Sequence, residues 1–219
     1  MTNNFDTIRN YLIDSGIPMK MSEIGDLFFN IMLVRRGKDH PKLPAANYTF
    51  KSYYIDCIEK YDRYEEEIIK CCNLFGLRAY ISVNIKSKQK FSKMLSFEYS
   101  RDVLNGEFKK PWRRIDHTFG KIDGVNKAWI VDVDGEHLEK DDHMLEALVS
   151  IIRRCKSKFD DPIIEVIPTK SGYHILARPF NTHEFECKFK EVYGDVDMPD
   201  IKKNHITLLY ENVDEQQRT

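Results

Sequence analysis

Two carboxylates one residue apart end a short apolar run in the middle of this 219-residue sequence. The run is Trp129-Ile130-Val131, and Asp132 and Asp134 follow it with one valine between them. On a β-strand, residues i and i+2 point to the same face, so both carboxylates would leave the strand together. Such a pair suits Mg²⁺ or Mn²⁺ and leaves coordination positions for phosphate oxygens, as phosphoryl or nucleotidyl transfer requires. A strand that ends in an Asp-Gly turn explains the same residues without a metal.

A second segment supplies a histidine for the same site. Residues 161–177 are typical of a strand, a tight turn at Ser171-Gly172 and a second strand, with His174 just after the turn. A hairpin next to the carboxylate strand would bring His174 close to the metal. The alternative is a histidine that only supports the hairpin.

In this order the two motifs resemble those of the archaeo-eukaryotic primase superfamily, the primase-polymerases. The resemblance covers about residues 75 to 212 and rests on Asp132-Val133-Asp134 and Ser171-Gly172-Tyr173-His174. It implies a catalytic core that uses Mg²⁺ or Mn²⁺ to add nucleotides to a 3′-hydroxyl. Nucleoside triphosphates and a DNA or RNA template are the implied partners, and a separate helicase or replication protein is a further one to consider.

The resemblance also implies roles for single residues. Family members carry a third acidic residue, and here Asp197 is expected to join Asp132 and Asp134 as a catalytic metal ligand, with Asp200 and Glu211 as alternatives. His174 would contact the triphosphate of the incoming nucleotide. Polar side chains on nearby turns and strand ends would complete the nucleotide site, and they are Lys170, Ser171, Lys203, Asn204 and Arg78.

A basic segment with one indole is the candidate for nucleic-acid binding. In Lys109-Lys110-Pro111-Trp112-Arg113-Arg114, four cations surround Trp112, a composition suited to phosphate contact and base stacking. We expect Lys109, Lys110, Trp112, Arg113 and Arg114 to contact nucleic acid, with a solvated loop as the alternative. The whole chain gives no such signal, because 34 basic and 35 acidic residues leave a net charge of -1.

The elements that must position these residues indicate an α+β fold, a mixed or antiparallel sheet with a helical N-terminal extension. Apolar spacing predicts helices over residues 5–15, 22–34 and about 49–75, then a strand over 78–84. Two further helices are expected over residues 87–105 and 141–158. In the first of these, Phe91, Met94, Leu95 and Leu104 are the core candidates. We therefore divide the chain into an extension, residues 1–75, and a catalytic domain, residues 76–219.

Cysteine usage and hydropathy exclude several classes. The five cysteines show no CxxC spacing, which argues against a disulfide framework and a zinc knuckle. The sequence has no basic leader and no run of eighteen apolar residues. The expected location is the cytoplasm, with no membrane partner.

Three other functions compete with a polymerase. His205-Ile206-Thr207 is half of the motif of the 2H phosphoesterases, but the sequence holds no second His-x-Ser/Thr. Asp-Val-Asp-Gly is similar to the motif of phosphatases with a nucleophilic aspartate, although theirs is usually N-terminal. The third alternative is a primase-fold module that binds nucleotide or nucleic acid without turnover.

Overall fold

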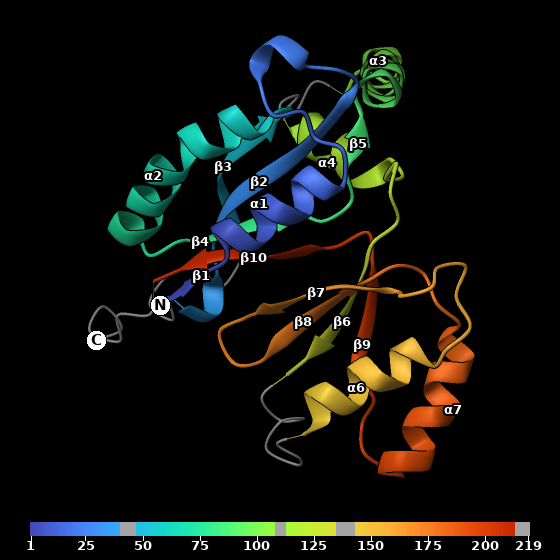
Figure 1. Ribbon diagram of the computed structural model, residues 1–219. Coiled ribbons are helices and arrows are strands. Elements are labelled where there is room, and N and C mark those ends of the chain that lie inside the picture. Colours follow the sequence, from blue (N-terminus) through green and yellow to red (C-terminus); the bar gives the residue numbers. More distant parts are fainter. Residues whose placement is uncertain (40–46, 108–112, 135–142, 213–219) are drawn as a thin grey trace.

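Two antiparallel sheets with helices packed on them make up the described part of the chain (Figure 1). The computed structural model describes residues 1–39, 47–107, 113–134 and 143–212. The fold class is therefore α+β, as the sequence predicts.

The strands and helices follow one another along the chain in a mixed order. The strands are β1 (Thr2–Asn3), β2 (Leu27–Arg35), β3 (Tyr48–Ile55), β4 (Arg78–Ser82), β5 (Lys86–Ser87), β6 (Trp129–Val133), β7 (Ile163–Pro168), β8 (Tyr173–Ala177), β9 (Asp200–Lys203) and β10 (Ile206–Glu211). The α-helices are α1 (Phe5–Asp14), α2 (Ile58–Phe75), α3 (Lys88–Leu104), α4 (Arg113–Lys121), α6 (Met144–Arg153) and α7 (Thr182–Tyr193). Short 3₁₀ turns lie at Met21–Glu23 and Gly37–Asp39.

The larger sheet has the strand order β1-β10-β4-β2-β3, with β5 beside one end of β2. Strand β2 pairs with β3, β4 and β5, and its residues Phe28 to Ile31 are buried. A central strand covered on both faces has a nearly continuous apolar sequence. The helix predicted over residues 22–34 is wrong, because a short apolar run fits a buried strand as well as a helix.

The helix predicted over residues 49–75 is correct only in its second part. Residues Tyr48–Ile55 form edge strand β3, and α2 starts at Ile58. It ends as expected at Gly76, whose φ of 60° is left-handed and whose N–H donates to the Cys72 carbonyl. The N-terminal part is thus not a purely helical extension. Its strand β2 pairs with β4, so the boundary expected after residue 75 falls inside one sheet.

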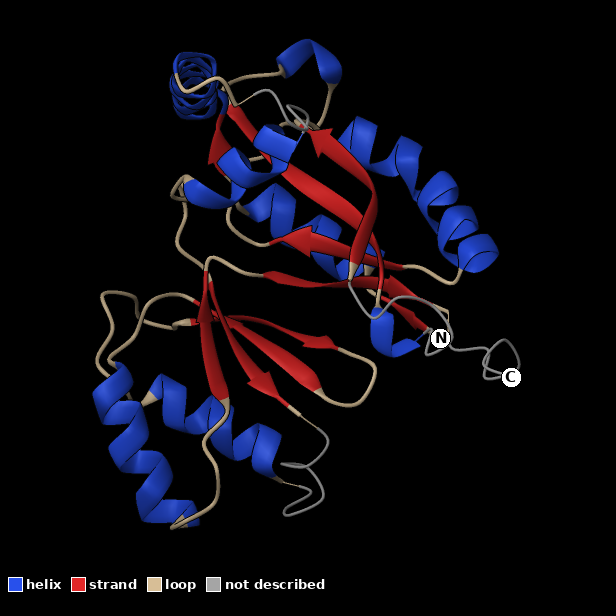
Figure 2. Cartoon of the chain, turned by 180° about the vertical axis from the view of Figure 1, so that it is seen from behind, coloured by secondary structure: helices blue, strands red, loops and turns tan. Residues whose placement is uncertain are grey.

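The smaller sheet has the order β7-β8-β6-β9 and the connectivity β6-α6-β7-β8-α7-β9. This is the ferredoxin-like β-α-β-β-α-β arrangement. Val131 of β6 packs on the side of α6 and α7 with Leu148 and Phe185. Ile130 and Leu176 belong instead to the core of the larger sheet. The smaller sheet therefore lies between its two helices and the larger sheet, as Figure 2 shows from behind.

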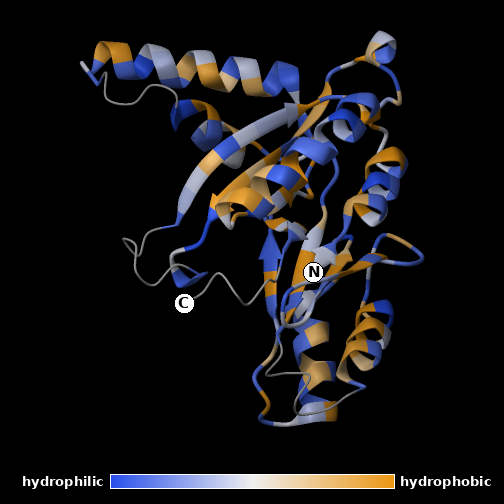
Figure 3. Cartoon of the chain, turned by 90° about the vertical axis from the view of Figure 1, so that its left-hand side faces the viewer, coloured by the Kyte–Doolittle hydropathy of each residue, from blue (hydrophilic) through white to orange (hydrophobic). Residues whose placement is uncertain are grey.

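Helix α3 confirms the prediction over residues 87–105, but its buried face is not the predicted one. Leu104 is 85% exposed and Met94 is also exposed, so their expected core positions are wrong. The buried positions are the acidic Glu98 and Asp102. Figure 3 shows polar and apolar residues mixed along this helix, which extends away from the body of the molecule.

None of the described helices combines the length and the apolar character needed to cross a lipid bilayer.

Candidate active site

Asp132 and His174 lie side by side on neighbouring strands of the smaller sheet. They are direct partners in the antiparallel pairing of β6 and β8. His174 Nε2 is 3.2 Å from Asp132 Oδ1, and both side chains are largely buried. Asp132 follows Ile130 by two residues, so it shares the face that packs on the larger sheet. The predicted proximity of the carboxylate strand and the histidine is therefore present.

Thr207 holds the other side of the His174 ring. Its Oγ1 lies 2.8 Å from His174 Nδ1 and comes from β10 of the larger sheet. Because an ionised Asp132 can only accept, Nε2 donates to the carboxylate. In the neutral ring, Nδ1 then accepts the Thr207 hydroxyl proton. This chain of carboxylate, imidazole and hydroxyl resembles a nucleophile triad, but Thr207 is fully buried, so its hydroxyl is closed to an external substrate.

Lys202 on β9 is the second partner of Asp132, since its ammonium group contacts Asp132 Oδ2. The hydrogen bond from His174, followed by that from Lys202, holds the pKa of Asp132 well below its usual range despite burial. The next residue, Lys203, lies on the opposite face and places its Nζ 4.5 Å from the centroid of the Trp129 indole ring. Alternation along β9 thus brings Lys202 beside Asp132, while Lys203, the predicted nucleotide ligand, faces away.

Gly172 explains why the turn before His174 requires a residue without a side chain. A Cβ atom at this position would lie 2.0 Å from the Val133 carbonyl oxygen. The turn between β7 and β8 is therefore pressed against the end of the carboxylate strand. This close approach sets the position of His174 relative to Asp132.

The other predicted carboxylates differ in how they lie relative to Asp132. Asp134 follows the end of β6 and is exposed. Asp197 is exposed in the segment before β9, where it lines a cavity with Phe189 and Lys190 of α7. Asp200, the alternative third acid, is the direct strand partner of Asp132. The register therefore favours Asp200 over Asp197.

The residue types fit Mg²⁺ or Mn²⁺, because carboxylate oxygens are their preferred ligands. The Lys202 ammonium is a positive charge that already stands at the Asp132 carboxylate. Within the described ranges, no three His, Cys, Asp or Glu side chains are arranged to hold a metal ion. Asp132, Asp134 and Asp200 are the donors that would hold one, and their side chains would have to move together to do so.

A second group of charges surrounds Glu211 at the end of β10. Buried Arg78 places its guanidinium 3.1 Å from Glu211 and 2.8 Å from Asp39. Lys170, on the turn before His174, has its Nζ 4.0 Å from the same Glu211 carboxylate. Arg78 and Lys170 are thus brought together by Glu211, in ion pairs within the protein.

Ser171 and Asn204 have different surroundings. Ser171 is exposed on the turn. Asn204 has a left-handed φ of 55°, donates to the Gly120 carbonyl at 3.0 Å and accepts from Lys86 at 2.6 Å. Asn204 therefore shapes the link between β9 and β10.

Of the basic segment that is predicted to contact nucleic acid, the structure describes only Arg113 and Arg114. Lys109, Lys110 and Trp112 lie outside the described residues. Arg114 forms a two-pronged ion pair with Asp102 of α3, so it fastens α4 to α3. Arg113 is exposed.

The 2H phosphoesterase alternative gains no support from the geometry. His205 is exposed and its Nδ1 lies 3.1 Å from the Ile206 carbonyl oxygen, whereas the Thr207 hydroxyl is engaged by His174.

Sequence reasoning missed the role of Thr207 and the specific pairing of Lys202 with Asp132. Strand alternation separates Lys202 from Lys203, but the face that each one takes depends on the register with β6. No local signal identifies Thr207 as the partner of His174, because the two residues meet across different sheets.

Comparison with protein-family models, curated proteins and solved structures gives no match for this chain. The functional argument therefore depends on the motifs and the geometry.

Proposed function

We propose that this chain is a metal-dependent nucleotidyltransferase of the primase-polymerase kind, which adds nucleotides to a 3′-hydroxyl on a DNA or RNA template. The observation that carries the proposal is the pairing of Asp132 with His174 on adjacent strands of a β-α-β-β-α-β sheet. The Gly172 turn pressed against the same strand end supports it. These features join the two motifs on which the resemblance rests.

Asp132, Asp134 and Asp200 are the proposed ligands of Mg²⁺ or Mn²⁺. The ions would supply neutralising charge to the phosphates and lower the pKa of the attacking hydroxyl. His174, oriented by Thr207, directs its one Nε2 proton to the Asp132 carboxylate, and a triphosphate bound beside Asp132 would accept this hydrogen bond in place of the carboxylate. Lys202 adds a cation on the same face, where it can pair with phosphate oxygens.

The proposed partners follow from this reaction. They are nucleoside triphosphates, a nucleic-acid template and, as a further candidate, a helicase or replication protein on a separate chain. The cytoplasm is the compartment expected for such a reaction.

A second candidate, a primase-fold module without turnover, is favoured by one specific observation. Both oxygens of Asp132 are engaged, Oδ1 by His174 and Oδ2 by Lys202. In such a module, Lys202 would permanently replace the metal charge, and the protein would bind nucleotide or nucleic acid only.

Incorporation of a labelled nucleotide into a primed template, with Mn²⁺ or Mg²⁺, tests the proposal. The wild type should extend the primer, and Asp132→Asn should lose at least about 100-fold in rate, because a ligand to the ions is removed. Asp160→Asn changes an exposed carboxylate in the loop before β7, and this variant should act like the wild type. Absence of extension by a folded wild type that still binds nucleotide would establish the module instead.

A further inference from the structure

Three exposed aromatic rings gather along β3, the edge strand of the larger sheet. Tyr48 and Phe50 on β3 are 55% and 45% exposed, and Phe75 at the end of α2 is 48% exposed. The Phe50 and Phe75 ring centroids are 5.1 Å apart. Large exposed aromatic rings in one place are typical of a binding surface.

Basic residues that form no ion pair with the described carboxylates lie on the segments next to these rings. No carboxylate within the described ranges forms an ion pair with any of four basic residues: Arg35, Arg36, Lys38 and Arg113. The Arg35 guanidinium lies 6.0 Å from the centroid of the Tyr48 ring. The Gly37 N–H, between Arg36 and Lys38, donates to Asn47 Oδ1 at 3.2 Å, so this basic segment is tied to the start of β3.

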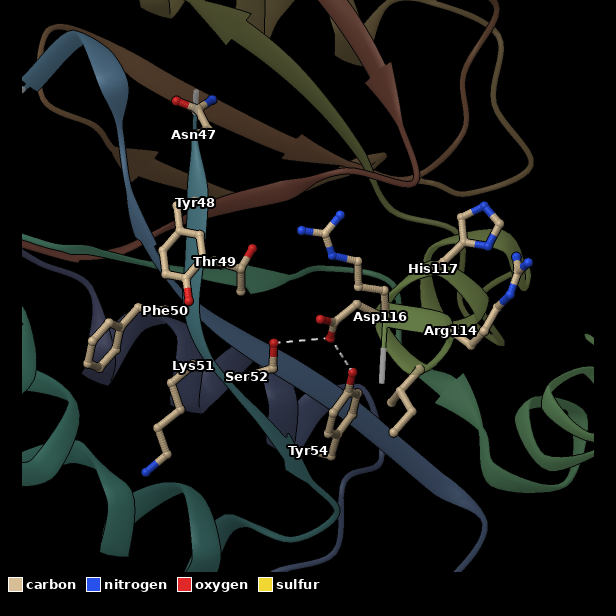
Figure 4. A pocket seen from close by; sticks show the side chains of 12 residues that line it. Asn47, Tyr48, Thr49, Phe50, Lys51, Ser52, Tyr54, Arg114, Asp116 and His117 are labelled. Atoms are coloured by element: carbon tan, nitrogen blue, oxygen red, sulfur yellow. Dashed lines mark hydrogen bonds between the residues drawn. The ribbon is translucent and has the colours of Figure 1, made fainter. Parts of the chain in front are cut away.

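A cavity of about 990 Å³ joins β3 to α4 and includes Tyr48, Phe50 and Arg113 in its lining. Figure 4 shows Ser52 and Tyr54 turned toward Asp116, with Phe50 on the other side of the strand. The Asp116 carboxylate accepts from Ser52 at 3.1 Å and from Tyr54 at 2.5 Å. These bonds fix the first turn of α4, and with it Arg113, beside the edge strand.

We propose that this region binds single-stranded nucleic acid. We name it the β3 edge surface and define it by Tyr48, Phe50, Phe75, Arg35, Arg36, Lys38 and Arg113. Every base has a face that can stack on an aromatic ring, and unpaired cations can follow a phosphate backbone without reading sequence. In a duplex the base faces are covered, so exposed rings favour a single strand.

The edge position of β3 also raises the question of a peptide strand. The pairing of β3 with β2 shifts between Leu33 and Val34, opposite Phe50, and such a bulge disturbs the hydrogen-bonding edge. Together with the unpaired cations, this favours a polyanion over a peptide. The inference relies on the proposed function only for the role of the bound strand as template, because binding itself needs neither metal nor nucleotide.

Fluorescence anisotropy with a labelled oligothymidylate of about 12 nucleotides, at low salt and without metal, tests the surface. Tyr48→Ala and Phe50→Ala should each weaken binding about 10-fold, as expected for the loss of one stacked base. Tyr48→Phe keeps the ring and should bind like the wild type. The triple variant Arg35→Gln, Arg36→Gln, Arg113→Gln should lower the slope of log Kd against log salt by about 2.

Matched controls lie away from the β3 edge surface, in the loop between α6 and β7 and on α7. Phe159→Ala removes another exposed ring and Lys190→Gln another exposed cation, and both should leave binding unchanged. Circular dichroism should show that every variant is folded. Equal affinity of Tyr48→Ala and the wild type, absence of wild-type binding, or equally tight binding of a duplex would each overturn the inference.

Failure of the proposed function gives a different result. Asp132→Asn should bind the oligothymidylate like the wild type while it loses incorporation. Binding without any incorporation by the wild type would refute the polymerase and leave the β3 edge surface intact, whereas incorporation without an effect of Tyr48→Ala on binding would refute only the surface.

Discussion

His174 Nε2 lies 3.2 Å from Asp132 Oδ1 across two antiparallel strands, and Thr207 engages the opposite ring nitrogen at 2.8 Å. The imidazole is therefore held from both sides, by one residue of its own sheet and one of the larger sheet. Lys202 completes the group from β9. The following predictions concern this group and the residues that support it.

Asp132→Asn should lower the free energy of unfolding by about 2 kcal/mol at neutral pH, because hydrogen bonds to a charged carboxylate are lost. The folded-state pKa of Asp132 lies below its unfolded value. Its stabilisation is therefore present above the unfolded pKa and is lost as pH falls below about 4. Urea denaturation of both proteins between about pH 3 and 7 should show the difference closing at acid pH. A difference that stays constant over this range would contradict the prediction.

Lys202→Met should increase the affinity for Mn²⁺ about fivefold or more, because a positive charge next to the metal ligand is removed. Isothermal titration calorimetry without nucleotide measures it. Lys203→Met removes the same charge from the next residue, which faces Trp129 instead, and should leave Mn²⁺ affinity nearly unchanged. Equal effects of the two variants would mean that only the general charge matters.

Gly172→Ala should destabilise the protein by about 2–4 kcal/mol and reduce activity, because the new methyl group would overlap the Val133 carbonyl oxygen. The β7–β8 turn must then move, and His174 with it. Thermal unfolding and the incorporation assay measure the two effects. Gly25→Ala is the control, since a Cβ at Gly25 would meet nothing within 4 Å. Unchanged melting of Gly172→Ala would mean that the close approach does not constrain the turn.

Thr207→Val keeps the shape of the side chain but removes the hydroxyl that orients His174. We expect a loss of about 1–2 kcal/mol in stability and a change in the Nδ1 chemical shift, because Nδ1 loses the hydroxyl that donates to it while Asp132 still holds the proton on Nε2. Nitrogen NMR shifts of the His174 ring measure this change, and Thr207→Ser should restore the wild-type spectrum. If Thr207→Val leaves the ring spectrum unchanged, Thr207 has no orienting role.

Lys86 should make the stability of the protein depend on pH through a buried ammonium group, whereas Asp132 does so through a hydrogen-bonded carboxylate. Burial lowers its pKa to about 8, and its ammonium donates to the Ile122 carbonyl at 2.7 Å and to Asn204 Oδ1 at 2.6 Å. Between about pH 8 and its unfolded pKa of about 10.4, the unfolded chain binds the proton and the native one does not. Stability should therefore rise with pH in this window, by at most about 1.4 kcal/mol per pH unit. Urea denaturation of the wild type and Lys86→Met should show this rise only in the wild type, and parallel curves would refute it.

The sequence alone determined the elements that depend on local spacing. The carboxylate strand at β6, the turn and strand that carry His174, helix α3 and the end of α2 at Gly76 are all found as predicted. Each depends on neighbouring residues: strand alternation, a glycine in a turn, helical periodicity or a left-handed cap.

Only the tertiary structure decided which of these residues meet. The apolar run of β2 became a strand because β3 and β4 lie on either side of it, where periodicity alone permits a helix. The pairing of β9 with β6 places Asp200, and not Asp197, opposite Asp132. The same pairing places Lys202, and not Lys203, on the face of the sheet that carries Asp132. A shift of one residue in that register would move Asp200 away from Asp132 and place Lys203 instead of Lys202 on its face, and register is set by long-range contacts that no local pattern encodes.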